Sequence, residues 1–364
     1  MVAGTEKFAV PAVADPDVVQ VLDELFADYR AAGAGKARTG VAVHLDAGLW
    51  TQLDEMGFTR LTGAAADGGS GGTFTDAAAM YGLAAGAAAP VPLVEHDVLA
   101  GWLLAEAGLP NDGALRTAAL VGADGTAVAV PWASAADAVV ALWADADGAL
   151  RVADVAASRL RIEPGLDIAG YPCDTVVFPV AELSAGTVVP AGVADRFRLR
   201  GALARCAQIA GGMERVVEIC VQYTSERIQF GRPLARQQAV QQLVSAIAAE
   251  TALARAATDT AVVRAAAGDF AGAETEFFIA VAKSCVGHAA SVVVRNAHQA
   301  LGAVGTTLEH DLQTLTKPIL ARRNDFGTVH EWDQRLADLS RAAGPDRLWS
   351  LITTGLGTSG ADRG

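Results

Sequence analysis

The sequence contains few cysteines and no pair of them at metal-binding spacing. Its four cysteines, Cys173, Cys206, Cys220 and Cys285, are scattered through 364 residues without a C-x-x-C pair. This scatter excludes a disulfide framework and a cysteine-rich zinc site, and it is typical of reduced thiols. The six histidines are also dispersed. We therefore expect no metal site and a cytoplasmic protein.

Positive charge is also scarce. The chain has 28 Lys and Arg residues against 41 Asp and Glu, a net charge of −13, which argues against a nucleic-acid partner. Hydrophobic residues make up 52%, and the mean hydropathy is +0.29. Charged residues, Gly or Pro interrupt every apolar run before it reaches about 18 residues, so we expect no membrane span. The N-terminal sequence also lacks the basic and apolar regions of a secretory signal.

Helical and strand patterns alternate in blocks along the chain. Asp15 followed by Pro16 predicts a helix start, whereas DGGSGG at 67–72 predicts a loop. No Lys-Ser/Thr follows this loop, so it is not a phosphate loop of the usual kind. We predict an α+β multidomain protein with a helical domain at 1–114, a small β-domain at 115–196, a helical domain of the four-helix type at 197–350 and a disordered tail at 351–364.

The segment YTSERIQFGRPLARQQAVQQ, residues 223–242, combines a helix break with side chains that suit a nucleotide. Arg227 is a planar donor suited to phosphate, and Phe230 offers a flat apolar face. Gly231 interrupts the helix, and Gln238 can pair with the edge of a base. The same residues also fit a simple helical corner with a solvated arginine and a core phenylalanine.

Two segments resemble the flavin-binding signatures of acyl-CoA dehydrogenases. ERIQFGRPLARQQAVQQ resembles an R-x-x-F-G stretch followed by P-L-x-x-x-Q-A-V-Q, and AHQALGAVGTTLEH at 297–310 resembles Q-x-x-G-G-x-G. A weaker likeness covers 57–85. The resemblance implies the acyl-CoA dehydrogenase fold, FAD as cofactor and an acyl-CoA thioester as substrate. The cofactor-binding residues it implies are Arg227, Phe230, Gly231, Gln238, Gln299 and Gly302.

The glutamate that removes the substrate α-proton in that family has no counterpart here. Where the family reads Y-E-G-T, this chain reads NDFGT, with Phe326 in place of the base. The alternative position, on the helix before R-x-x-F-G, matches Gly201 and Ala202. None of these side chains accepts a proton.

The predicted β-domain also lacks family motifs, because the T-E-P-x-x-G-S-D and W-x-S/T patterns that line the flavin ring in that family are absent. VPWASAAD occupies a comparable stretch. There Trp132 either faces a ring system or belongs to the core of the β-domain.

Three hypotheses follow from the resemblance. The preferred one is a companion subunit that binds the FAD tail within a heteromeric acyl-CoA dehydrogenase of the actinobacterial steroid or lipid type, with a homologous subunit supplying the base in a heterotetramer. The second is a self-sufficient homo-oligomeric enzyme with a displaced base, for which Asp325 and Glu309 are the candidates and His310 and Glu331 lie nearby. The third is a flavin-free structural or assembly subunit on the same fold.

Overall fold

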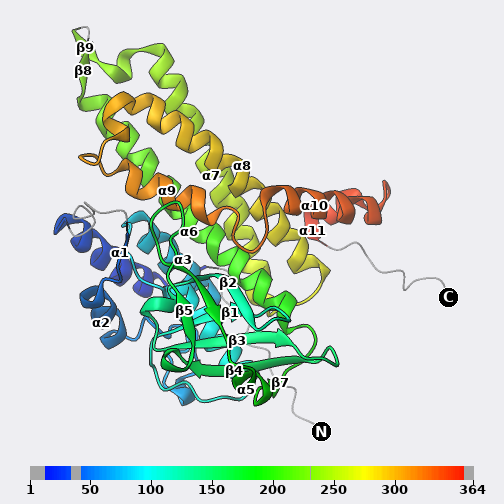
Figure 1. The fold of residues 1–364 in the computed structure, drawn as a ribbon. Helices are drawn as coiled ribbons and strands as arrows, with labels where there is room; N and C mark the ends of the chain where they lie inside the picture. Colours follow the sequence, from blue (N-terminus) through cyan, green and yellow to red (C-terminus); the bar gives the residue numbers. More distant parts are fainter. Residues whose placement is uncertain (1–12, 34–41, 230, 356–364) are drawn as a thin grey trace.

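The structure is a computed structural model that describes residues 13–33, 42–229 and 231–355. Helices come first in the chain, strands follow, and long helices end it (Figure 1), which confirms the predicted α+β architecture. The N-terminal elements are α1 (Pro16–Ala31), α2 (Ala47–Glu55), the 3-10 turn η2 (Ala65–Asp67), α3 (Phe74–Gly86), the π-helix η3 (Val94–Gly101) and α4 (Trp102–Glu106).

Polar caps fix the first helices. Asp15 accepts a hydrogen bond from Asp17 N at 2.9 Å, and Pro16 is the first helical residue, as predicted. At the start of α3, Thr73 and Asp76 form a reciprocal capping box. Asp76 also accepts from Asp15 N at 2.7 Å. One carboxylate therefore caps α3 and holds the start of α1 against it.

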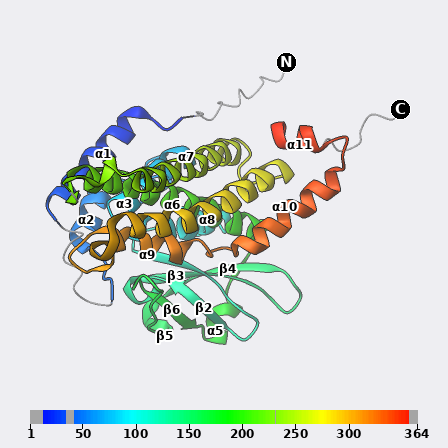
Figure 2. The ribbon, with the colours of Figure 1, turned by 90° about the horizontal axis from the view of Figure 1, so that it is seen from above.

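The middle of the chain forms two small sheets that lie as one layer against the helices (Figure 2). One sheet has the order β1-β3-β4-β7, with β1 (Arg116–Leu120), β3 (Ala138–Ala144), β4 (Leu150–Ala156) and β7 (Thr187–Val188). The other has the order β2-β6-β5, with β2 (Thr126–Pro131), β6 (Cys173–Val177) and β5 (Arg161–Glu163). The strands β1 and β3 pair in parallel, and the other pairs are antiparallel. Short helical turns complete this region: η4 (Ala133–Ala135), η5 (Ala157–Arg159) and α5 (Val180–Ser184).

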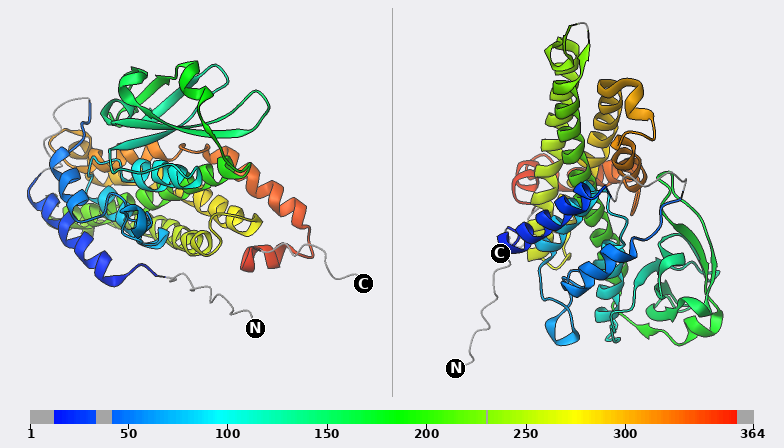
Figure 3. Two further views of the ribbon diagram at one scale, coloured as in Figure 1. Left: turned by 90° about the horizontal axis from the view of Figure 1, so that it is seen from below. Right: turned by 90° about the vertical axis from the view of Figure 1, so that its left-hand side faces the viewer.

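The C-terminal part is built on three long helices, α6, α7 and α8, that run side by side (Figures 1 and 3). They break near Gly231, Gly268 and Gly302, as the sequence predicts. The helices are α6 (Val193–Glu226), α7 (Gln238–Ala267), α8 (Ala273–Leu301), α9 (Leu312–Arg322), α10 (Val329–Ala343) and α11 (Leu348–Thr354). The connections contain β8 (Ile228–Gln229), β9 (Arg232–Pro233), η6 (Leu234–Arg236) and η7 (Gly302–Thr306).

Backbone contact between two glycines holds the N-terminal helices on the bundle. A Cβ atom added to Gly211 of α6 would lie 2.2 Å from the carbonyl oxygen of Gly82 of α3. Real side chains do not fit at such a distance, so only glycine allows this approach. The crossing fixes α3, and with it the N-terminal helices, against the centre of α6.

In the described part of the chain, one helical segment is long and apolar enough to cross a membrane by length and composition. It covers Ala273–Thr306, and 67% of its most apolar window is buried inside the protein. The expectation of no membrane span rested on uninterrupted apolar runs, whereas this criterion tolerates a few charges and glycines. The segment is α8, which packs against α6, α7, α9 and α10 as a core helix. Its burial is that of the central helix of a bundle.

The predicted tail begins too early. Residues 351–354 belong to α11, which ends at Thr354 with Gly355 in the left-handed region. Leu351 is buried, which explains why this turn is helical. Residues 356–364 lie outside the described part of the chain.

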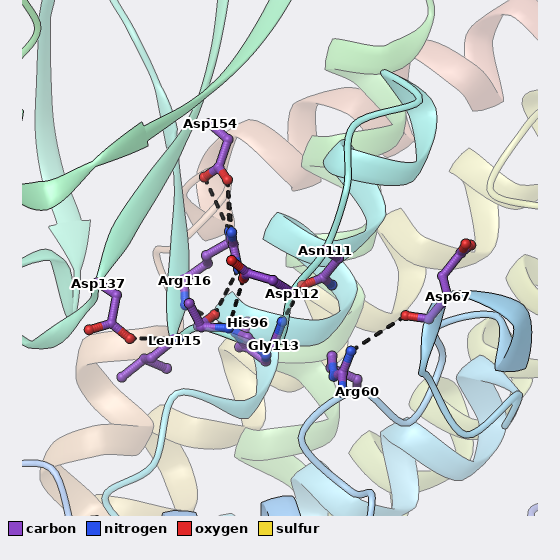
Figure 4. Close-up of polar contacts among 11 residues, drawn as sticks. Arg60, Asp67, His96, Asn111, Asp112, Gly113, Leu115, Arg116, Asp137 and Asp154 are labelled. Atoms are coloured by element: carbon purple, nitrogen blue, oxygen red, sulfur yellow. Dashed lines mark hydrogen bonds and ion pairs between the residues drawn. The ribbon is translucent and has the colours of Figure 1, made fainter.

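A buried polar network joins the β-domain to the N-terminal helices (Figure 4). Arg116 of β1 is 5% exposed and binds both carboxylate oxygens of Asp154 on β4, at 2.9–3.1 Å. Its remaining guanidinium nitrogen, Nη1, donates to Asp112 at 2.7 Å. The Arg116 backbone N–H donates to Nδ1 of His96 on η3 at 3.0 Å. His96 thus accepts a hydrogen bond as a neutral imidazole, and the network fixes η3 beside β1.

We expect acid to destabilise the protein partly through His96. Burial, followed by the charges of Arg116 and Arg60, lowers the pKa of His96 from 6.5 to about 4. Between these values the unfolded chain binds the proton and the folded chain does not, so stability falls as pH drops through this window. In His96→Gln this contribution is absent.

The expected difference between the wild type and His96→Gln in their loss of stability from neutral pH to about pH 4 is about 3 kcal/mol. Urea unfolding at a series of pH values measures it. The neighbouring Asp97, whose pKa burial raises to about 7, acts with the opposite sign in the same window. Because Asp97 is present in both proteins, its contribution cancels in the comparison. Parallel pH profiles of the two proteins would show that His96 is not the group concerned.

Candidate functional site

A cavity of about 590 Å³ lies between the β-domain, the start of α6 and the segment after α9. Trp132 and Tyr171 line it from the β-domain side, and their rings meet edge to face at 5.6 Å. Trp132 is 4% exposed. It is therefore both a packed residue of the β-domain and a wall of the cavity, so the two alternatives left open by the sequence do not exclude one another.

Arg205 of α6 is the central charge of this cavity. It donates to Glu95 Oε1 at 2.6 Å, to Asp325 Oδ2 at 2.7 Å and to Gln208 Oε1 at 2.8 Å. Burial alone would lower the pKa of Arg205, but the two carboxylates outweigh it and raise that pKa. Each of the three charged groups is therefore paired, and Arg205 and Glu95 are both only 4% exposed.

Phe326 fills the place where the resemblance puts a base. Its ring covers Gly201 so closely that a Cβ added to Gly201 would lie 2.3 Å from Cζ of Phe326. Phe197 meets the same ring edge to face at 5.9 Å. The two positions at which the family carries its glutamate are therefore in contact here, and apolar atoms occupy both. Phe326 has φ of 57°, a costly conformation for a bulky residue.

Hydrogen bonds from other elements hold the strained segment in place. Lys283 of α8 is 1% exposed and donates to the carbonyl oxygens of Arg323 at 3.0 Å and Asp325 at 2.8 Å. Arg198 donates to the carbonyl oxygen of Phe326 at 3.3 Å. The side chain of Asp325 is bound to Arg205 at the same time. The surrounding structure thus keeps Phe326 over Gly201.

Arg322 was missed by the sequence reasoning, because no motif marks it. It lines the cavity, and its guanidinium lies over the ring of Tyr171 at 5.2 Å. Among residues 13–33, 42–229 and 231–355, no carboxylate forms an ion pair with it. Burial lowers its pKa. It is the one cavity arginine that keeps donors free for a ligand.

The predicted FAD-binding residues gather at the far end of the bundle, away from this cavity (Figure 1). Arg227 is the C-cap residue of α6 and is exposed, and Gln238 is the first residue of α7. Gln299, also exposed, lies in the last turn of α8, and Gly302 caps it with φ of 66°.

A ring contact joins the last turn of α6 to the loop before α9 at this end, since Tyr223 and His310 meet edge to face at 6.0 Å. Gly231 lies in the hairpin between β8 and β9 with φ of 76°, which explains the glycine. Phe230 lies outside the described residues. The structure therefore brings five of the six predicted residues to one end of the bundle and leaves their role in binding as a prediction.

The remaining carboxylate candidates have other positions. Glu309 is exposed in the turn before α9 and does not line the cavity. Glu331 forms a capping box with Thr328 at the start of α10, with bonds of 2.6 and 2.9 Å. In the described part of the chain, no group of three or more His, Cys, Asp or Glu side chains is arranged to hold a metal.

Comparison with known proteins agrees with this architecture. Residues 193–328 match the family described as acyl-CoA dehydrogenase, C-terminal domain. The chain is 28% identical to the acyl-CoA dehydrogenase IpdE2 of Mycobacterium tuberculosis over 313 residues, which covers 83% of this chain and 91% of that one. It is 28% identical to the acyl-CoA dehydrogenase FadE34 of the same organism, of which it spans 40%.

Solved structures show the same fold. The ChsE4-ChsE5 complex from Mycobacterium tuberculosis superposes with a TM-score of 0.81 at 19% identity, covering 92% of this chain and all of the matched chain. A variant of the Tcur3481-Tcur3483 steroid acyl-CoA dehydrogenase gives 0.76 at 20% identity, with 90% and 98% covered. The chain is thus similar over most of its length to acyl-CoA dehydrogenases, has their fold, and carries their C-terminal domain at residues 193–328.

Proposed function

We propose that this chain is the companion subunit of a heteromeric acyl-CoA dehydrogenase that acts on an acyl-CoA thioester in the cytoplasm. In the assembled enzyme it holds the tail of FAD for a homologous subunit, and that subunit carries the base. The flavin supplies the acceptor for the β-hydride when bound. This chain contributes phosphate and base contacts, and it does not move a proton.

The observation that carries the proposal is the contact of Phe326 with Gly201. A base must reach the α-carbon proton at hydrogen-bond distance. Here an aromatic ring occupies one glutamate position and leaves no room for a side chain at the other. Of the carboxylates that line the cavity, Asp325 and Glu95 are both bound to Arg205.

The far end of the bundle fits a nucleotide tail. Arg227 is exposed and forms no ion pair with any described residue, so its planar donor face is free for a phosphate. A Cβ at Gly302 or Gly231 would meet nothing within 4 Å, so a ligand can approach the backbone there. Gln238 and Gln299 offer amide groups to the base.

The same end offers an apolar surface for a partner subunit. Its large exposed hydrophobic residues lie on the end of α6, the β8–β9 hairpin and the loop after α8: Val221, Ile228, Val304 and Leu308. Exposed apolar side chains close together are typical of protein interfaces. A partner that covers them would place its own site beside the predicted FAD-tail residues. The names of the structural neighbours, which include two-protein complexes, support this arrangement.

Two other functions remain as alternatives. In the first, the chain is a self-sufficient homo-oligomeric enzyme with Asp325 or Glu309 as a displaced base; Asp325 lines the cavity, which is the observation in its favour. In the second, the chain is a flavin-free assembly subunit, and the arginine at the end of α6 binds no phosphate. Flavin content and activity separate these from the companion subunit.

We expect the chain expressed alone to be poorly soluble, poor in flavin, or an inactive homo-oligomer, and to gain FAD only with its partner subunit. Co-expression with homologous acyl-CoA dehydrogenase genes, followed by intact-complex mass measurement and a flavin spectrum, provides the test. The exposed apolar residues at the far end are the physical reason. A lone chain that sediments as a yellow, active homotetramer would contradict the companion role.

Replacing Arg227 with alanine should weaken FAD retention by the assembled complex about ten- to a hundredfold. The reason is the loss of a charge-assisted contact worth roughly 1.5–3 kcal/mol. Arg161→Ala is the matched control, because Arg161 is also exposed and lies on β5 of the β-domain. Titration of FAD into the apo complex measures the FAD affinity of each variant. Equal FAD affinity in wild type and Arg227→Ala would remove Arg227 from the site.

A further inference from the structure

A second cavity, of about 770 Å³, lies between the N-terminal helices and the start of the C-terminal bundle. Its walls are the glycine-rich loop around 60–73, the segment 101–111 that contains α4, Arg200 of α6, and the turn at 265–270 between α7 and α8. None of these residues lines the first cavity. The loop that contains DGGSGG has no role in the proposed function, so its place in a cavity wall calls for an explanation.

Arg200 is a buried cation with incomplete partners. Its side chain is 11% exposed and lies between two aromatic rings, with its guanidinium carbon 4.7 Å from the ring centre of Trp102 and 4.5 Å from that of Phe270. Its carboxylate contact is to Asp269 at 3.4 Å, and that side chain is 70% exposed. This distance is longer than a good charged hydrogen bond. The Nε atom of Arg200 is buried and has no hydrogen-bond partner.

Two other buried arginines have carboxylate partners that balance their charge. Arg116 and Arg205 each bind two carboxylates, with closest contacts of 2.7 and 2.6 Å, and the pKa of each is raised in spite of burial. Burial, followed by the positive charge of Arg196, lowers the pKa of Arg200 to about 10, although Asp269 acts in the opposite direction. Arg200 therefore has a weaker carboxylate partner than Arg116 or Arg205.

A second guanidinium faces the same cavity from the glycine-rich loop. Arg60 is half-buried, and its Nη1 lies 3.5 Å from the carbonyl oxygen of Asp67 (Figure 4). Within the described part of the chain it forms no ion pair. Glycine makes room for it at Gly68, where an added Cβ would lie 3.1 Å from Nη1 of Arg60. Asn111 accepts from Gly113 N at 3.3 Å and also lines the cavity.

Three carboxylate residues, Asp67, Asp97 and Asp269, also line the cavity. Asp269 pairs with Arg196 at 3.3 Å and with Arg200 at 3.4 Å. Asp97 accepts hydrogen bonds from the backbone N–H of Thr62 at 3.1 and 3.2 Å and from its hydroxyl at 2.9 Å. It is 3% exposed and makes no ion pair with Arg60 or Arg200 in the described residues. The apolar part of the wall includes Phe74 and Phe270, in edge-to-face contact at 4.7 Å.

We propose that this cavity binds a small organic anion, a carboxylate, sulfonate or phosphate group carried on an apolar body. Arg60 and Arg200 hold the anionic group from two walls, and Asn111 adds a neutral donor. The aromatic wall covers the apolar part. The two arginines with free donors would recognise the charge of such a molecule, and the aromatic rings would recognise its apolar part.

Benzenesulfonate is a suitable probe for the full-length chain, because its charge is constant near neutral pH. Calorimetric titration, with quenching of tryptophan fluorescence as a second signal from Trp102, should show saturable binding at one site. Arg60→Gln should weaken binding at least about tenfold, the effect of losing one charge-assisted contact. Benzenesulfonamide is a neutral molecule of the same shape. Its affinity for the wild type should be no higher than the affinity of benzenesulfonate for Arg60→Gln.

Two control variants locate the site. Arg322→Gln removes the free arginine of the first cavity, and Arg161→Gln removes an exposed arginine of β5. Neither should change the affinity. Loss of binding in Arg322→Gln with normal binding in Arg60→Gln would move the anion to the first cavity and overturn the proposal. Absence of binding by benzenesulfonate, sulfate and phosphate to the folded wild type would overturn it as well. These measurements need no flavin, so their failure is independent of the proposed function.

Discussion

Replacing Arg205 with methionine is expected to lower the free energy of unfolding by about 3–5 kcal/mol. Methionine approximates the length of the arginine side chain but leaves Glu95 and Asp325 without their shared partner. Glu95 is 4% exposed on its side chain, so its charge would be buried and unpaired. Urea unfolding followed by circular dichroism measures the loss.

A compensating variant tests whether the unpaired charges are the cause. Adding Glu95→Gln and Asp325→Asn to Arg205→Met removes both charges, and we expect it to recover part of the lost stability. Arg161→Met serves as the surface control, because Arg161 and its partner Glu163 are 71% and 58% exposed; its expected effect is small. If Arg205→Met unfolds at the urea concentration of the wild type, the network contributes nothing to stability.

Replacing Asp325 with asparagine should lower dehydrogenation by the assembled complex less than about threefold. Loss of a general base costs about 10²–10⁴ in rate. Asparagine keeps the shape and the hydrogen bond from Arg205 while it removes the ability to accept a proton. The small expected effect follows from the position of Asp325, whose carboxylate is held by Arg205 at 2.7 Å. Steady-state turnover with an artificial electron acceptor measures it.

Glu309→Gln and Glu331→Gln extend the same measurement to the other candidates. Both carboxylates are exposed, and Glu331 caps α10, so we expect normal turnover in each. A fall in turnover by about 10²–10⁴ in any of the three variants, with FAD still bound, would identify that residue as a displaced base. The self-sufficient enzyme would then be the better account.

Local signals predicted the fold well. The change from helical to alternating apolar patterns near residue 115 matches the start of β1 at Arg116. The breaks at Gly231, Gly268 and Gly302 are visible in sequence because glycine relieves positive φ or ends helices, and Gly231 and Gly302 both have positive φ. The N-cap of α1 was predicted for the same reason, since Asp15 and Pro16 act on their immediate neighbours.

The cavity network could not be predicted, because it depends on distant residues. Arg205 is 110 positions from Glu95 and 120 from Asp325. No local pattern reports such a contact. The sequence shows separately that Phe326 and Gly201 are not bases, but their contact requires the tertiary packing of α6 against the segment after α9. Arg322 and the uncompensated Arg200 were missed because a free arginine differs from a paired one only in its surroundings.

The same limit explains the early start of the predicted tail and the membrane-like composition of α8. Leu351 extends α11 because it is buried, whereas the polar composition around it predicts a tail. The apolar segment at 273–306 passes the membrane criteria because it lies at the centre of the bundle. In both cases burial decides, and burial is a property of the folded chain.

Reduction of bound flavin by substrate without oxygen tests the central claim most directly. The chain alone in the presence of added FAD, and the complex with its partner subunit, are mixed in turn with a series of acyl-CoA thioesters, and flavin bleaching is followed. The account predicts no bleaching by the lone chain and rapid bleaching by the complex, including the complex that carries Asp325→Asn. Rapid bleaching by the lone chain, lost on Asp325→Asn while FAD stays bound, would contradict it.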